Sequence, residues 1–316
     1  TASSIIDSSA SGDVISAVAN SWVGGLVGYM TGDISGSSSS GNVTASGSGS
    51  KVGGLVGFTT GGISDSVSTG AVTAGTNAVA GGLVGQASGA LSSVRASGNV
   101  TGGDGAIVGG LAGKNYGKVT QAIAIGDATA GVGGSAGGLV GQNDGGISVS
   151  YATGAATASG ATGALGYAGG LVGDNEAAIS QAYSTGAATG LTNAYVGGLI
   201  GKWGAGTVSD AYATGLVTGQ TGQIGGFAGV RAGNPGASDG YFDTTTTGTK
   251  TAIGKVDQYT YVFNINGLTT YQFAQGQAYL SGSWVTGAPY KVLSALPYIV
   301  VTGVGNAHET YGSSTV

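Results

Sequence analysis

Hydrophobic residues recur along most of this chain in short groups that glycines separate. A string of the form Gly-Gly-Leu-Val-Gly, or a close variant, begins eight times at steps of 29, 28, 28, 28, 32, 28 and 28 residues. The strings begin at Gly24, Gly53, Gly81, Gly109, Gly137, Gly169, Gly197 and Gly225. A constant period in this range is typical of solenoids. The one long step indicates about four extra residues in a surface loop within residues 158–167.

Two further segments keep the same period. An aliphatic residue or Ala follows each first glycine by ten to twelve positions and opens a run of small and polar residues. These residues are Ile34, Ile63, Leu91, Val119, Ile147, Ile179, Val208 and Ala237. A third short segment comes next, as in residues 71–73 and 99–101. Helical 3.6-residue spacing is missing, so each repeat predicts three strands of about 3–5 residues that glycines bound.

The pattern predicts an all-β protein, a right-handed parallel β-helix (β-solenoid) of about nine three-strand coils with about 28 residues each. Each strand pairs with its counterparts in the neighbouring coils, and equivalent residues stack in columns about 4.8 Å apart. The aliphatic residues named above form one inward column. The other inward column is expected at Leu26, Leu55, Leu83, Leu111, Leu139, Leu171, Leu199 and Phe227.

The two ends of the chain depart from the repeat. Residues 5–12 align with residues 63–70, so the chain is expected to open in mid-repeat, either as a piece of a longer protein or with an end that contacts a neighbour. After about Tyr241, aromatic residues become dense. We divide the chain into a solenoid over residues 1–250, a C-terminal cap over 251–299, and a linker or start of a following module over 300–316.

Within the predicted cap, Thr269 and Gln272 have the spacing of a capping box. This spacing predicts a short helix from about residue 270 to about residue 280. Phe273 and Leu280 are then the candidates for its buried side. An irregular loop is the alternative.

Composition excludes several classes of protein. Glycine supplies 69 of 316 residues, but without the every-third-residue period of collagen. The absence of cysteine removes disulfides, thiolate metal sites and cysteine nucleophiles. A net charge of −5 with only 9 basic residues gives no footprint for nucleic acid. No stretch approaches the ~18 apolar residues that a membrane-spanning helix needs.

Two aspartates are the candidate catalytic residues. Asp210 and Asp239 follow Val208 and Ala237 by two positions each, so they are expected about 5 Å apart on neighbouring coils. Retaining glycosidases use a similar separation of two carboxylates. Asp is also common at turns and strand ends, and the same column contains Asp7. No charged cleft accompanies the pair, so we predict no enzymatic activity, no cofactor and no metal.

Two other columns invite a functional interpretation. Tyrosines follow the aliphatic column by four positions at Tyr151, Tyr183, Tyr212 and Tyr241. Such a ladder either binds sugar rings or packs within the fold, and packing is favoured. Strict alternation puts it on the inward face, unless a bend reverses the alternation. Threonines form a row that either orders water or reflects strand propensity, at Thr44, Thr73, Thr101, Thr129, Thr157, Thr189 and Thr218.

The repeated Gly-Gly-Leu-Val-Gly string, followed by Ile-Ser-x-Ser/Ala-Tyr-Ala/Ser-Thr-Gly, resembles the GLUG motif of filamentous-haemagglutinin-like surface exoproteins and adhesins of bacteria. The likeness covers residues 1 to about 250. It implies an extracellular location, on a large secreted or surface-displayed protein that is exported with an outer-membrane transporter. The expected partners are a host surface, a glycan or copies of the chain itself, with no nucleic acid and no membrane-spanning segment.

The function expected from repeat and resemblance together is that of an extracellular structural or adhesive rod segment. A self-assembling extracellular fibre subunit is the first alternative. A β-helix carbohydrate-active enzyme, which would use Asp210 and Asp239, is the second.

Overall fold

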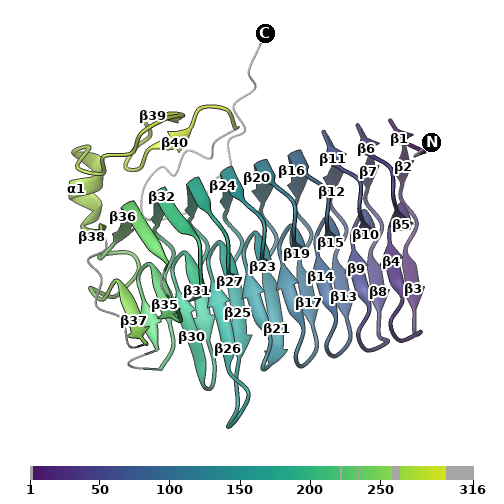
Figure 1. Ribbon diagram of the computed structural model, residues 1–316, viewed down its shortest axis with the longest axis horizontal. Coiled ribbons are helices and arrows are strands. Elements are labelled where there is room, and N and C mark those ends of the chain that lie inside the picture. Colours follow the sequence, from purple (N-terminus) through teal and green to yellow (C-terminus); the bar gives the residue numbers. More distant parts are fainter. Residues whose placement is uncertain (1–2, 221–222, 234, 258–263, 297–316) are drawn as a thin grey trace.

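The computed structural model describes residues 3–220, 223–233, 235–257 and 264–296. The chain winds into coils that stack in a single row, with the strands of each coil beside those of the next (Figure 1). Four large sheets of parallel strands result, which we call sheets A to D. Sheet D has nine strands, one for each coil, so the predicted all-β solenoid of about nine coils is confirmed. Its right-handedness stays a prediction.

A coil passes through sheets C, D, A and B in that order. Sheet C contains β4 (Trp22–Gly24), β9 (Lys51–Gly53), β14 (Val79–Gly81), β18 (Ile107–Gly109), β22 (Ser135–Gly137), β26 (Gly166–Gly169), β30 (Ala194–Gly197) and β34 (Ile224–Gly225). Sheet D contains β5 (Val27–Met30), β10 (Val56–Thr59), β15 (Val84–Ala87), β19 (Ala112–Asn115), β23 (Val140–Asn143), β27 (Val172–Asn175), β31 (Ile200–Trp203), β35 (Ala228–Arg231) and β37 (Ile253–Val256).

The other two sheets complete the coil. Sheet A contains β1 (Ile5–Ile6), β2 (Ser9–Ala10), β6 (Ile34–Ser35), β7 (Ser38–Ser39), β11 (Ile63–Ser64), β12 (Val67–Ser68), β16 (Leu91–Ala96), β20 (Val119–Ala124), β24 (Ile147–Ala152), β28 (Ile179–Ser184), β32 (Thr207–Ala213), β36 (Gly236–Asp243) and β38 (Ile265–Leu268). Sheet B contains β3 (Val14–Ser16), β8 (Val43–Ala45), β13 (Val72–Ala74), β17 (Val100–Gly102), β21 (Ala128–Val132), β25 (Ala156–Ser159), β29 (Ala188–Gly190) and β33 (Val217–Thr218).

Each Gly-Gly-Leu-Val-Gly string contributes to two strands that meet at a bend. In the second coil β9 ends at Gly53 and β10 begins at Val56, so Gly54 and Leu55 form the bend. A Cβ atom on Gly53 would lie 2.7 Å from the backbone nitrogen of Gly85, which leaves no room for a side chain. The glycines are therefore required by close approach of backbones. A coil has four strands where the sequence predicts three segments, because one apolar run is divided at this bend.

The interior is built from two sets of columns. The leucine column lies between sheets A and D, where Leu55, Leu83, Leu111, Leu139, Leu171, Leu199 and Phe227 are fully buried and Leu26 is partly buried. The aliphatic column that begins at Ile34 packs against it. A second apolar cluster of Val and Ala side chains fills the space between sheets B and C.

A ladder of buried amides marks the end of three sheet D strands. The Nδ2 group of Asn115 donates to Oδ1 of Asn143 at 2.9 Å, and Nδ2 of Asn143 donates to Oδ1 of Asn175 at 2.8 Å. All three side chains are fully buried, and the ladder gives partners to the Oδ1 atoms of Asn143 and Asn175, whereas Oδ1 of Asn115 has none among the described residues. In the next two coils, fully buried Trp203 and Arg231 occupy the same column. Nothing in the sequence repeat singles out this column, because its residue type changes along the rod.

The long step in the repeat coincides with an enlarged loop between β25 and β26. Ala161 and Ala164 form a bridge within it, so the prediction of extra loop residues between 158 and 167 is confirmed. The loop protrudes from the end of the coil where sheets B and C meet (Figure 1).

Parallel pairing continues past residue 250. β37 pairs with β35, and β38 pairs with β36. The chain then turns back along the outside of sheet A through α1 (Thr270–Ala274), β39 (Trp284–Val285) and β40 (Val292–Leu293), which we call the strap, residues 269–296 (Figure 1). β39 and β40 pair antiparallel. The predicted module over residues 300–316 lies outside the described residues.

The predicted short helix is confirmed, although it is shorter than expected. Both hydrogen bonds of the capping box join Thr269 and Gln272. The helix ends at Ala274 and buries Phe273. Leu280 is also buried, but it lies beyond the end of the helix.

Candidate functional site

A bend within sheet A turns the tyrosines outward. In nine successive coils the residue at this bend has a positive φ of +47° to +61°. These residues are Asp7, Gly36, Asp65, Ser93, Gln121, Val149, Gln181, Asp210 and Asp239. A left-handed residue interrupts the alternation of side chains. Ile147 therefore lies in the interior, while Tyr151, four residues later, belongs to a separate cluster on the outside of the sheet.

The tyrosine column is continuous and in register. Tyr151 pairs with Tyr183, Tyr183 with Tyr212, and Tyr212 with Tyr241. The rings of Tyr151 and Tyr183 stack with centroids 4.8 Å apart and planes 8° apart, and those of Tyr183 and Tyr212 stack at 5.0 Å and 8°. All four side chains are at most 4% exposed. The column therefore has no ring face open to a sugar in this structure.

The strap covers the column at Tyr183, Tyr212 and Tyr241. The Tyr212 ring lies 6.0 Å from Phe273, 5.5 Å from Trp284 and 5.9 Å from Tyr290, measured between centroids. Its hydroxyl donates to the carbonyl oxygen of Lys291 at 2.7 Å. Burial holds the pKa of the Tyr212 hydroxyl well above its ordinary value. This hydroxyl is thus a neutral donor that fixes the strap to the sheet.

A single buried carboxylate joins the last strand to the strap. Asp243 is fully buried at the end of β36. Its Oδ1 atom accepts hydrogen bonds from the backbone nitrogens of Thr245 at 2.7 Å and Thr246 at 3.2 Å. Its Oδ2 atom accepts from the hydroxyls of Thr270 at 2.6 Å and Tyr290 at 2.7 Å. Four donors from the next turn and both ends of the strap therefore converge on one side chain.

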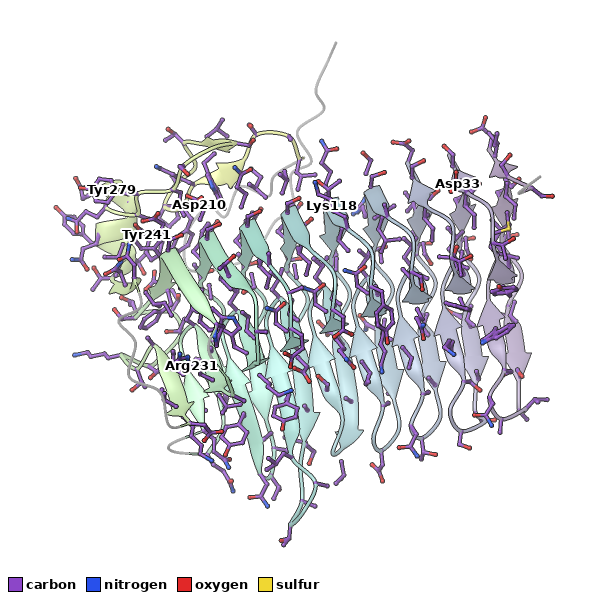
Figure 2. All side chains as sticks on the ribbon, viewed as in Figure 1. Asp33, Lys118, Asp210, Arg231, Tyr241 and Tyr279 are labelled. Carbon is purple, nitrogen blue, oxygen red and sulfur yellow. The ribbon has the colours of Figure 1, made fainter. Side chains whose placement is uncertain are left out.

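The two candidate catalytic aspartates also bind the C-terminal part of the chain. Oδ1 of Asp210 accepts from the backbone nitrogen of Ser281 at 2.7 Å and from its hydroxyl at 2.8 Å. Oδ1 of Asp239 accepts from Nδ2 of Asn264 at 3.1 Å. Figure 2 places Asp210 and Tyr241 at the end of the rod that carries the strap, near Tyr279. Asp210 and Asp239 both have a positive φ, which Asp tolerates better than most residues, and this gives a conformational reason for Asp at both positions.

Sequence reasoning names the tyrosines and the aspartate pair but misses what they hold. The strap partners Trp284, Tyr290 and Phe273 carry no repeat signal, since they occur once each. Asp243 lies two residues after Tyr241 in the sequence. Its role becomes apparent only from the hydroxyl groups of Thr270 and Tyr290 that donate to it, and both are distant in the sequence. The arrangement is built to bind the protein's own C-terminal segment.

The threonine row lies on the outside of sheet B. Its seven members pair in register from Thr44 to Thr218. Thr73, Thr101, Thr129 and Thr218 are exposed, and the other three are half-buried. Whether the row orders water stays a prediction.

Comparison with known protein families gives a match for one part of this repeat solenoid. Residues 19–44, which run from the end of the first coil through β4, β5, β6 and β7 to β8, match the family described as the GLUG motif. GLUG repeats occur in surface adhesin-like proteins. No curated protein and no solved structure gives a match. In the described ranges, no helix is long and apolar enough to cross a membrane.

Proposed function

We propose that this chain is a structural and adhesive rod segment of a large bacterial protein that is secreted or displayed at the cell surface. The observation that carries the proposal is the row of in-register coils, in which interior strands of each sheet pair with both neighbours. Repeated nearest-neighbour pairing gives a stiff, elongated body. Such a body spaces or displays binding surfaces along its length.

The GLUG match supports the cellular setting of this proposal. By likeness to adhesins that carry the same motif, the parent protein would be filamentous-haemagglutinin-like and exported with an outer-membrane transporter. Its partners would be a host surface, a glycan or further copies of the chain.

The location is tested on intact cells that express the parent protein. Antibodies against this chain should label unpermeabilised cells, and brief treatment with an added protease should remove the label. Labelling that appears only after the cells are lysed would contradict an extracellular role. A cytoplasmic enzyme measured in the same samples controls for leakage.

We propose further that the chain has no catalytic role. Asp210 and Asp239 accept hydrogen bonds from Ser281 and Asn264, which favours a supporting function. The double variant Asp210→Asn, Asp239→Asn should leave the release of reducing sugar from a polysaccharide panel at the level of the unmodified chain. Cleavage by the unmodified chain that the double variant loses would instead favour the glycosidase alternative.

A further inference from the structure

Two columns of outward-facing residues run side by side on either side of the bend between sheets C and D. One column lies on the sheet C strands, which precede the bend, and the other on the sheet D strands, which follow it. The sheet C column is Trp22, Lys51, Val79, Ile107, Ser135, Tyr167 and Tyr195. The sheet D column is Tyr29, Phe58, Gln86, Lys114, Gln142, Asp174 and Lys202. We call the pair of columns the seam. Side chains of the two columns touch at both of its ends.

The first two coils place three aromatic rings on the seam. Trp22 and Tyr29 lie 4.6 Å apart, Tyr29 and Phe58 stack at 5.4 Å, and Trp22 and Phe58 lie 5.8 Å apart, measured between ring centroids. Trp22 is 47% exposed and Tyr29 is 42% exposed. The rings lie on the flank of the rod, so a coil stacked before them would lengthen the columns and leave this outer face open.

A lysine lies over the same rings. Nζ of Lys51 is 5.3 Å from the centroid of Phe58 and 6.0 Å from that of Trp22, within the range of a cation–π interaction. Among the residues that the structure describes, Lys51 has no ion-pair partner. In the first four coils the seam contains a second lysine, Lys114, and no carboxylate. This part of the seam therefore complements an anion.

The far end of the seam shows the same side-chain types without a free cation. Nζ of Lys202 lies 6.0 Å from the ring of Tyr167, but it also pairs with Asp174 at 3.1 Å and Glu176 at 3.0 Å. Burial disfavours the ammonium form, yet the two carboxylates outweigh it and raise the pKa of Lys202. Tyr195 there is only 7% exposed. Rings and lysine at this end are satisfied within the protein, which makes it a matched control.

We propose that Trp22, Tyr29, Phe58 and Lys51 form a binding site for a glycan chain whose sugars carry carboxylates. One face of a pyranose ring presents C–H groups, which pack on exposed aromatic faces. The ammonium group of Lys51 pairs with the carboxylate, and the amide of Gln86 in the next coil is placed to meet hydroxyls further along the chain. The coil spacing of about 4.8 Å repeats such contacts at intervals comparable to one sugar.

This inference deepens the proposed adhesive function and rests on it. The probe is hexagalacturonate, with its fully methyl-esterified form as the uncharged counterpart. The full chain carries 5-fluorotryptophan, which gives one ¹⁹F signal each for Trp22, fully buried Trp203 and strap residue Trp284. Hexagalacturonate should shift the signal of Trp22 and leave the other two in place. The ester should bind about tenfold more weakly.

Variants locate the site. Tyr29→Ala should weaken binding of hexagalacturonate about tenfold, and Lys51→Met should abolish the preference for the acid over the ester. Tyr116→Ala, which removes a lone ring of 48% exposure, and Lys202→Met at the far end should change neither. An unchanged Trp203 signal, or an unchanged Trp284 signal for Lys202→Met because Lys202 is next to Trp203, shows that the coils are folded.

A Trp22 signal that hexagalacturonate does not move, or binding that Tyr29→Ala leaves intact, would overturn the site. Either result leaves the cell-surface labelling experiment untouched, so the rod function would stand. Binding with the expected variant pattern, on a chain that labels only lysed cells, would keep the site and remove the surface function.

Discussion

Sheet A carries one outward column whose two ends differ in chemistry. In the first three coils it contains Ser9, Ser38 and Val67, of which the two serines are exposed. Through Arg95 and Ile123 it changes to the four buried tyrosines of the last coils. The backbone is the same at both ends, with a positive-φ residue at each bend. The tyrosines therefore serve the strap and are not required by the coil.

The largest expected effect comes from removing one ring beneath the strap. Tyr212→Ala should lower the free energy of unfolding by about 3–5 kcal/mol, because it empties a buried site and removes the hydrogen bond to Lys291. Val67→Ala, in the same column without the strap, should cost at most about 1 kcal/mol. Urea unfolding of both variants measures the contrast. Equal losses would mean that the strap adds nothing to the column.

Asp243→Asn should have the next largest effect. The amide keeps the size of the side chain but loses the charge that strengthens bonds from Thr270 and Tyr290. We expect a loss of about 2 kcal/mol, confined to the strap. The ¹⁹F signal of Trp284 should move toward that of an exposed indole at lower urea than the signal of Trp203. Coincident transitions would contradict a separate role for Asp243.

Alkaline pH should release the strap. Burial and the hydrogen bond to Asp243 raise the pKa of Tyr290 from 10.0 to about 12. The neutral hydroxyl is favoured in the folded strap, so its contribution is complete below pH 10 and is lost as the pH rises through about 12. The Trp284 signal should report this change. Tyr290→Phe should reduce the pH dependence above 10, part of which Tyr212 also causes, whereas Tyr271→Phe, on an exposed ring, should not.

The smallest effect concerns the aspartates at the bend. Asp210→Gly and Asp65→Gly both place glycine at a positive φ, which relieves backbone strain equally. Only the first also removes the acceptor for Ser281. Asp210→Gly should therefore be less stable than Asp65→Gly by about 0.5–1 kcal/mol, each compared with the unmodified chain in thermal unfolding. No difference between the two would show that the Ser281 contact is not stabilising.

Sequence accounts for the coils and only partly for the candidate site. The coil length, the inward leucines and the register of the tyrosines can be predicted from the repeat of about 28 residues, because each coil packs against neighbouring coils of the same kind. The bend at Gly54 and Leu55 was not predicted, since it divides one apolar run. The face of Tyr151 stayed open, because alternation fails at Val149, whose positive φ nothing in its side chain predicts. The strap occurs once in the chain, so no repeat in the sequence indicates that its Trp284 contacts the tyrosine column.

The exposed cluster of Trp22, Tyr29 and Phe58 was missed for a related reason. The residue type in the seam columns changes from coil to coil, so no constant residue marks these positions in the repeat. Seven positions separate Trp22 from Tyr29, and only the tight bend between β4 and β5 brings their rings together.

The most direct test of the strap on the tyrosine column is a measurement of nuclear Overhauser effects on the chain with selectively labelled aromatic side chains. The structure predicts cross-peaks between the rings of Trp284 and Tyr212, whose centroids are 5.5 Å apart, and between Trp284 and Tyr183 at 6.0 Å. Trp203 and Phe227, at 6.0 Å in the interior, give the reference intensity. A reference peak of full strength, with no cross-peak from Trp284 to either tyrosine, would show that the strap does not lie on the tyrosine column.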